Sequence, residues 1–224
     1  MTLSPDTKTV FTIGTFAINA TIVNTWIIIF VLVSLSALLT RRLRTSGISP
    51  VQNFLETMIE LIAAQIDEVT GRGHRRYFPF IATLFLFIAV SNLATIIPFF
   101  HAPTASLSTT AALAFCVFLS VPFFGIASSG LKNYFGQYFQ PSVFMFPFHV
   151  LSEISRTVAL AVRLFGNIMS STMIGAIFLL VIPFIFPVIM QILGLVTGLI
   201  QAYIFSILAL VFISSAESAH NGGD

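Results

Sequence analysis

A stripe of polar side chains inside an apolar segment is the part of this sequence best able to do chemistry. The stripe comprises, at intervals of three, seven and four residues, Glu153, Arg156, Arg163 and Asn167. A helix would carry side chains at these intervals near one face. They lie within the 36 residues from Phe146 to Val181, which are otherwise largely apolar. If that segment crosses a membrane, ionisable side chains within it mark an ion path or a binding site.

Arg163 is the most costly member of the stripe, because it lies near the middle of the segment with no acid at its own depth. Arginine keeps its proton at any relevant pH, and a guanidinium at the bilayer centre costs between about 2.5 and more than about 10 kcal/mol. The nearest acid on the same helix, Glu153, is ten residues away, roughly 15 Å along the axis. The sequence therefore predicts a counter-charge on another helix, supplied by another protein.

A second long apolar segment, from Pro187 to about Ser215, carries further polar residues. Gln191 and Gln201 lie within it. Gly194 and Gly198 form a GxxxG motif, which allows another helix to approach closely. Packing is the simpler interpretation of these two glycines.

The two segments are predicted to form a long, tilted helix hairpin. If the chain turns near Ile182, Arg163 and Gln201 each lie nineteen residues from the turn and face one another at mid-membrane. On the same count Glu217 falls opposite the start of the first helix, close to Glu153. A cluster of charges that also includes Arg156 is expected at this cytoplasmic mouth.

Composition places the whole chain in a membrane. Hydrophobic residues make up 57% of the 224 residues and charged residues only 8%, which leaves too little polar surface to coat a water-soluble globule. Cys116 is the single cysteine, so no disulfide or cysteine metal site is expected. Nothing in the sequence indicates a cofactor, a metal, a phosphate-binding loop of the form GxxxxGK[ST] or a nucleic-acid partner.

Five apolar runs are long enough to cross a hydrocarbon core of roughly 30 Å. They are Ala17 to Thr40, Tyr77 to Phe100, Ala105 to Ser129, Phe146 to Val181 and Pro187 to Ser215. Basic residues flank these runs on one side, which the positive-inside rule assigns to the cytoplasm: Arg41, Arg42, Arg44, Arg72, Arg75, Arg76 and Lys132. Lys8 lies on the other side. The prediction is an all-α, polytopic single membrane domain over residues 1–224, with the N-terminus outside and the C-terminus in the cytoplasm.

An amphipathic helix is predicted between the first two runs, over Pro50 to Val69. Its apolar residues follow a helical stripe, and its four acids lie off that stripe. Ser49 before Pro50 is a plausible start signal. A helix that lies along the cytoplasmic membrane surface or docks against a partner is favoured over a simple connector.

Three strings in this sequence resemble one known family. They are LAVRLFGN at Leu160 to Asn167, QAYIF with SSAES beyond it around Gln201, and NLATIIP followed by PTASLSTTAALA at Asn92 to Ala114. Together they are similar to subunit a of F-type rotary ATP synthases, in the form found in bacteria and plastids. Three matches in the right order, on the right spans, cover most of the chain.

The resemblance implies a stator subunit in the bacterial inner membrane, without catalytic activity of its own. In this family the arginine, here Arg163, faces the carboxylates of a rotating c ring and separates two offset half-channels. The expected partners are the c-subunit ring, the b subunits of the peripheral stalk, the soluble ATPase head and membrane lipid. A fixed positive charge draws each carboxylate into its ionised form and blocks direct leakage of cations.

The chain departs from the family at three places. Thr172 and Gly194 stand where many members carry titratable side chains, and Ser106 stands where an acid is common. The outer half-channel would then rely on hydroxyls, water, Asn167 and Gln191. This suits protons moving along water or sodium bound by oxygen ligands; protons are favoured by their frequency in the family.

Two other functions fit an apolar polytopic chain. A secondary transporter also uses intramembrane charges, but it usually shows internal repeats, and none is seen here. A non-conducting scaffold leaves the cost of Arg163 unexplained. Simpler structural interpretations also exist for the remaining polar residues: helix-to-helix hydrogen bonds for Gln201 and Asn167, an ion pair for Glu153 with Arg156, and solvation at a membrane boundary for His101 and His149.

Overall fold

The computed structural model describes residues 9–13, 16–41, 50–71, 76–97, 100, 102–130, 146–181 and 186–218. Several residues used in the topology prediction lie outside this part of the chain: Lys8, Arg42, Arg44, Ser49, Arg72, Arg75, His101, Lys132 and Ile182.

Five helices in the described part of the chain are long and apolar enough to cross a membrane. They are α1 (Ala20–Thr40), α3 (Phe78–Leu93), α4 (Leu107–Ser129), α6 (Phe146–Val181) and α7 (Phe186–Ser218). Two short 3-10 turns, η3 (Ala94–Ile96) and η4 (Pro103–Ala105), lie between α3 and α4. The predicted all-α, polytopic fold class is confirmed.

A short antiparallel hairpin near the N-terminus was not predicted. Strand β1 (Thr9–Ile13) pairs with strand β2 (Phe16–Asn19). The predicted first span, residues 17–40, therefore begins three residues too early, because the helix starts at Ala20. Both strands are rich in β-branched and aromatic residues, which favour strands. Apolar character alone does not separate such a strand from the first turn of a helix.

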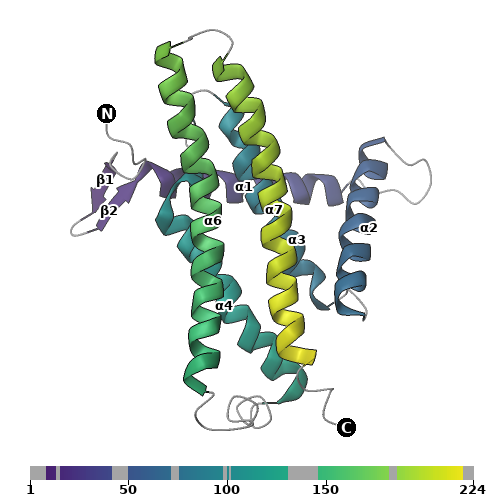
Figure 1. Cartoon of the computed structure of the whole chain (residues 1–224). Helices are drawn as coiled ribbons and strands as arrows, with labels where there is room; N and C mark the ends of the chain where they lie inside the picture. The colour runs from purple at the N-terminus through teal and green to yellow at the C-terminus, as the bar shows by residue number, and fades with distance from the viewer. Residues whose placement is uncertain are drawn as a thin grey trace.

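Helix α2 (Pro50–Thr70) is the predicted amphipathic helix, and it ends one residue later than expected. Its proline occupies the first turn, where a missing N–H costs nothing. Ile66 is only 1% exposed, and α2 packs against α3 and α7. Figure 1 shows α2 at one side of the molecule, running crosswise to α1. Its position at a membrane surface stays a prediction.

Helices α3, α4, α6 and α7 form one bundle. Helix α7 packs against each of the other three, and α6 also packs against α4. In Figure 1, α6 and α7 run side by side over most of their length, whereas α1 runs crosswise behind them. Helix α1 contacts the bundle through α3 and η4.

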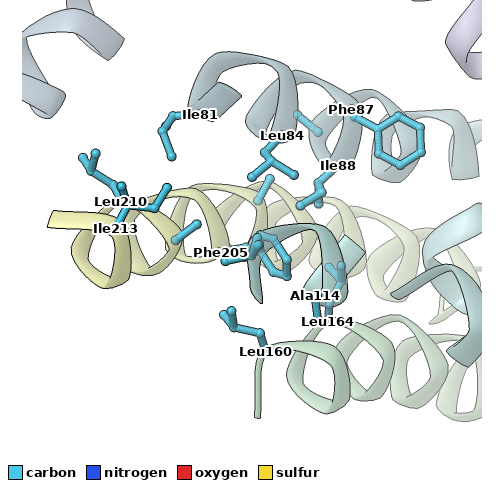
Figure 2. Close-up of a cluster of buried hydrophobic side chains, with 14 of the residues drawn as sticks. Ile81, Leu84, Phe87, Ile88, Ala114, Leu160, Leu164, Phe205, Leu210 and Ile213 are labelled. Carbon is cyan, nitrogen blue, oxygen red and sulfur yellow. The ribbon is translucent and has the colours of Figure 1, made fainter. Parts of the chain in front are cut away.

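The core of the bundle is built from apolar side chains of all four helices (Figure 2). Phe205 of α7 is fully buried and lies at its centre. Around it the four helices contribute Ile81, Leu84, Phe87, Ile88, Ala114, Leu160, Leu164, Leu210 and Ile213. This core fixes the relative positions of the helices that carry the polar residues.

Candidate functional site

The register of the α6–α7 hairpin can be read from one contact. A Cβ atom added at Gly194 would lie 3.5 Å from Cβ of Ser171, so these two residues are opposite one another. They are equally far from a point between residues 182 and 183. If this register continues along the hairpin, Arg163 lies at the level of residue 202, which follows Gln201 in the sequence.

Arg163 and Gln201 differ in burial, and no hydrogen bond joins them in the described part of the chain, so their predicted meeting at mid-membrane stays a prediction. Gln201 is buried at 6% exposure, whereas Arg163 is exposed. The buried face of α6 is formed at this level by Leu160 and Leu164, and Arg163 lies about 100° around the helix from Leu164. Burying a guanidinium without a partner costs several kcal/mol, so the apolar neighbour takes the inward position. Within the described residues no ion pair or hydrogen bond engages Arg163.

The predicted stripe on α6 follows the edge of its buried face. Glu153 and Asn167 are half-buried, and Arg156 and Arg163 are exposed. The guanidinium carbon of Arg156 lies 5.3 Å from the ring centroid of Phe212 on α7, a cation–π contact that joins the two helices. This contact places Arg156 of α6 beside the C-terminal part of α7.

Glu217 belongs to the last turn of α7. Its side chain lies outside the described residues. The contact of Glu217 with Glu153 and Arg156 in the predicted charge cluster therefore stays a prediction.

A buried cluster of polar side chains, Asn92 and Thr104, joins α3, η4 and α7, and sequence analysis missed it as a site. Asn92, 1% exposed, donates from Nδ2 to the carbonyl oxygen of Gly198 at 2.7 Å. Thr104, 0% exposed, donates from Oγ1 to Oδ1 of Asn92 at 2.9 Å. Asn92 was named only as the start of a matching string; a carboxamide inside an apolar run was the available signal.

Three polar atoms in this region lack a hydrogen-bond partner among the described residues. They are Oγ of Ser91, Nδ2 of Asn167 and Nε2 of Gln201, and all three are buried. Ser91 precedes Asn92 on α3, and Gln201 lies three residues beyond Gly198 on α7. Buried polar groups without protein partners are commonly satisfied by internal water.

The remaining predicted site residues lie on different elements and differ in burial. Ser106 is fully buried, with Oγ 2.7 Å from Oγ of Ser108. Gln191 is exposed and donates from Nε2 to the carbonyl oxygen of Thr95 at 3.3 Å, so it joins α7 to η3. Thr172 is exposed, and its hydroxyl donates to the carbonyl oxygen of Ile168 at 2.9 Å. The residues do not form one compact cluster.

The GxxxG motif serves two different helices. Gly194 faces Ser171 of α6 at ordinary contact distance. A Cβ atom at Gly198 would lie 3.1 Å from Cβ and Nδ2 of Asn92, so α3 approaches α7 more closely there. The close approach is what allows the Asn92 hydrogen bond to the backbone of α7.

A metal site is not supported by the described part of the chain, where no three His, Cys, Asp or Glu residues come together. The arrangement instead combines exposed Arg163, which has no ion pair among the described residues, with a buried cluster of polar side chains. Such a combination suits the movement of an ion between water and a charged partner group.

Comparison with known proteins gives a consistent result. The family described as ATP synthase A chain matches residues 22–214. "ATP synthase subunit a" of Albidiferax ferrireducens is 55% identical over 218 residues, which is 96% of this chain and 94% of the relative. "ATP synthase subunit a 1" of Chlorobium luteolum is 54% identical over 220 residues, covering 98% and 99% of the two chains. "ATP synthase subunit a 2" of Acaryochloris marina is 51% identical over 224 residues, covering 99% and 96%.

Proposed function

The chain belongs to the ATP synthase A chain family, and we infer that it is the stator subunit through which ions reach and leave the rotating ring of an F-type ATP synthase. The observation that carries this conclusion is Arg163. It is an obligate cation on the exposed flank of an apolar, membrane-length helix, without an acidic partner among the described residues. A carboxylate on a neighbouring subunit supplies the missing charge.

The fixed charge of Arg163 gives the ring a place to release its ion. A protonated carboxylate is neutral and can travel through lipid, whereas an ionised carboxylate is stabilised by a nearby guanidinium. When the ring brings a carboxylate to Arg163, its proton is released. Lysine would perform this role less well, because a buried lysine can lose its own proton.

We propose that the buried polar cluster ends one half-channel beside the arginine. Asn92 and Thr104 form this cluster, buried Ser106 follows Thr104 by two residues, and buried Gln201 lies three residues beyond Gly198 on α7. Asn167 on α6 and the exposed side chains of Gln191 and Thr172 are proposed to extend the path towards the surface that bears Arg163.

Protons are favoured over sodium as the transported ion. Two of the three unpartnered atoms, Nδ2 of Asn167 and Nε2 of Gln201, are amide nitrogens, which donate hydrogen bonds and do not bind a cation. They suit a chain of water molecules.

The second half-channel is proposed to open at the charged ends of α6 and α7. Glu153 and Arg156 lie there on α6, with Glu217 at the end of α7. Under the positive-inside rule, exposed Arg41 and Arg76 support a cytoplasmic position for the ends of α1 and α3 that they flank. We propose that the chain lies in a bacterial inner membrane with its N-terminus outside, and that it has no catalytic role of its own.

Co-purification tests the assignment against its alternatives. A tagged chain extracted in mild detergent is expected to bring with it a ring of small two-helix subunits, the b subunits of the peripheral stalk and the soluble ATPase head. Recovery of the chain alone would favour a secondary transporter. Recovery with membrane proteins but without ATPase subunits would favour a scaffold.

A further inference from the structure

A hydrogen bond between side chains joins the amphipathic helix α2 to α7. The hydroxyl of Tyr203 on α7 donates to Oε1 of Gln65 on α2 at 2.9 Å. Nε2 of the same Gln65 donates to Oε2 of Glu68, one turn further along α2, at 3.2 Å. Because its oxygen and its nitrogen are both engaged, the Gln65 carboxamide has one defined orientation, in which the oxygen faces α7.

Apolar packing fixes α2 at the point where this hydrogen bond forms. Ile66, the neighbour of Gln65, is 1% exposed and belongs to the bundle core, against which Ile62 and Val69 also pack. Figure 1 shows α2 and α6 on opposite sides of α7, and α2 contacts α7 directly. The core therefore sets the position of Gln65, which can then restrain α7.

Tyr203 and Gln201 lie on nearly opposite sides of α7. Two residues along an α-helix correspond to a rotation of about 200°. Gln201 is accordingly buried in the bundle, whereas Tyr203 is 46% exposed and reaches α2. A rotation of α7 that carried Gln201 out of the bundle would pull the hydroxyl of Tyr203 away from Gln65. The hydrogen bond therefore opposes this rotation.

Two hydrogen bonds from other helices reach α7 on either side of Gln201 in the sequence. Asn92 of α3 donates to the carbonyl oxygen of Gly198, three residues before Gln201. Gln65 of α2 accepts from Tyr203, two residues after it. Hydrogen bonds weaken steeply as their geometry departs from the optimum, so each of them restrains both the rotation and the position of α7.

We propose that Gln65 is a positioning residue for ion transport: through the hydroxyl of Tyr203, it holds α7 in the rotation that keeps Gln201 turned into the bundle. The proposal rests on the proposed function, in which Gln201 lies beside the path that leads to Arg163. Gln65 itself contacts no ion in this scheme. Helix α2 contributes to transport as a restraint on α7.

The test begins with ATP-driven proton pumping by purified complexes in lipid vesicles. Tyr203→Phe removes only the hydroxyl, and Gln65→Leu removes the acceptor with little change in size. Each change is expected to slow pumping about three- to fivefold. The double variant should be no slower than either single variant, because both remove the same hydrogen bond.

Two further variants serve as controls for this measurement. Gln65→Glu keeps an oxygen acceptor for Tyr203 and should pump close to the parent rate. Thr197→Val removes a hydroxyl of α7 that donates to carbonyl oxygens of its own helix, and it should also pump normally. Failure of Gln65→Glu to restore pumping relative to Gln65→Leu would overturn the proposal.

Tyr203→Phe in a Gln201→Leu background separates positioning from a general weakening of α7. If Tyr203 acts through Gln201, its loss has no further effect once the amide of Gln201 is absent. A purely structural role predicts the same slowing in both backgrounds. Equal slowing in the two backgrounds would therefore contradict the proposal.

A second readout reports on α7 without the ring. Gln201→Cys, in a Cys116→Ser background, is treated with a maleimide, and adding Tyr203→Phe is expected to raise the labelling rate at least about threefold, because α7 is freer to turn. An unchanged labelling rate, or unchanged pumping in Tyr203→Phe, would overturn the proposal. Absence of the ring from the purified parent would instead contradict the proposed function.

Discussion

Two arginines on one helix show how the environment separates structural from functional charge. Arg156 and Arg163 lie seven residues apart on α6, and both are exposed. Arg156 covers the ring of Phe212, a contact worth about 0.5–1 kcal/mol at an exposed site. Arg163 has no such contact among the described residues and lies near the middle of an apolar helix. Only Arg163 therefore needs a partner from outside the chain.

Gln201→Leu tests whether the amide of Gln201 acts in transport or in packing. Leucine is similar in size, and Nε2 of Gln201 is buried without a partner, so this change is expected to leave stability unchanged or slightly higher. Loss of a water-binding group beside Arg163 is expected to slow ATP-driven pumping about five- to tenfold, or ~1–1.4 kcal/mol. Pumping rates and thermal stability of the same purified complex give both quantities.

Unchanged pumping in Gln201→Leu would reassign Gln201 to helix packing. A drop in pumping accompanied by an equal drop in the amount of assembled complex would have the same meaning. Ala202→Ser, which adds a hydroxyl at the adjacent fully buried position, controls for general disturbance of α7.

At the scale of single residues, the sequence predicts how costly a side chain is in the membrane. It does not predict the direction in which that side chain points. The cost of Arg163 follows from residue type and depth alone. That Gln201 points into the bundle while Arg163 points out of it depends on which side of α6 packs against α4 and α7. The hydrogen bond from Asn92 to Gly198 joins residues 106 positions apart, which no local pattern reveals.

Among the elements, α6 is too long to stand upright in a bilayer. Its 36 residues extend about 54 Å, against a hydrocarbon core of roughly 30 Å. Helix α1 has 21 residues, about 31 Å, and matches the core without tilt. Figure 1 shows α1 crosswise to α6 and α7. If α1 spans the membrane, α6 and α7 are steeply tilted and present a long flank to the ring.

Gly198→Ala tests the close approach of α3 and α7. The added methyl group would lie 3.1 Å from Cβ and Nδ2 of Asn92, so Asn92 would have to shift by a few tenths of an ångström. We expect a loss of about 1–3 kcal/mol in stability and slower pumping, because the hydrogen bond from Asn92 to the α7 backbone is strained. Thermal denaturation of the purified complex measures the first effect.

Gly194→Ala is the matched control on the same motif. Its added methyl group would meet Ser171 at 3.5 Å, an ordinary contact, so both stability and pumping should stay near the parent values. Equal effects at the two glycines would mean that the motif acts only through general helix packing.

Element boundaries were predictable where polar residues or proline interrupt the apolar runs. The bounds of α6 agree with the predicted 146–181, and α7 extends the predicted 187–215 by a few residues at its C-terminal end. The first helix was misjudged at its start, since the residues of β2 are as apolar as those of a helix. The crosswise arrangement of α1 could not be predicted from the sequence. The length of an apolar run gives the length of a helix but not its orientation relative to other helices.

For the whole molecule, the distribution of basic residues predicts which side faces the cytoplasm. Arg41 follows α1 and Arg76 precedes α3, and both are exposed. Single cysteines at these positions, in a Cys116→Ser background, are expected to react with a membrane-impermeant maleimide in inverted vesicles and not in intact cells. A cysteine at Lys8, which lies outside the described residues, should show the opposite pattern. Labelling of Arg76→Cys from outside would reverse the assigned orientation.

The most direct test of the central claim is ATP-driven proton pumping by vesicles that contain the Arg163→Ala complex. Removal of the charge leaves the apolar contacts of α6 in place, so the complex is expected to assemble and the soluble head to hydrolyse ATP. Pumping should fall at least about a hundredfold, because no group remains to discharge the ring carboxylate. Val162→Ala, at the neighbouring exposed position, should pump normally. Near-normal pumping by Arg163→Ala would contradict the account.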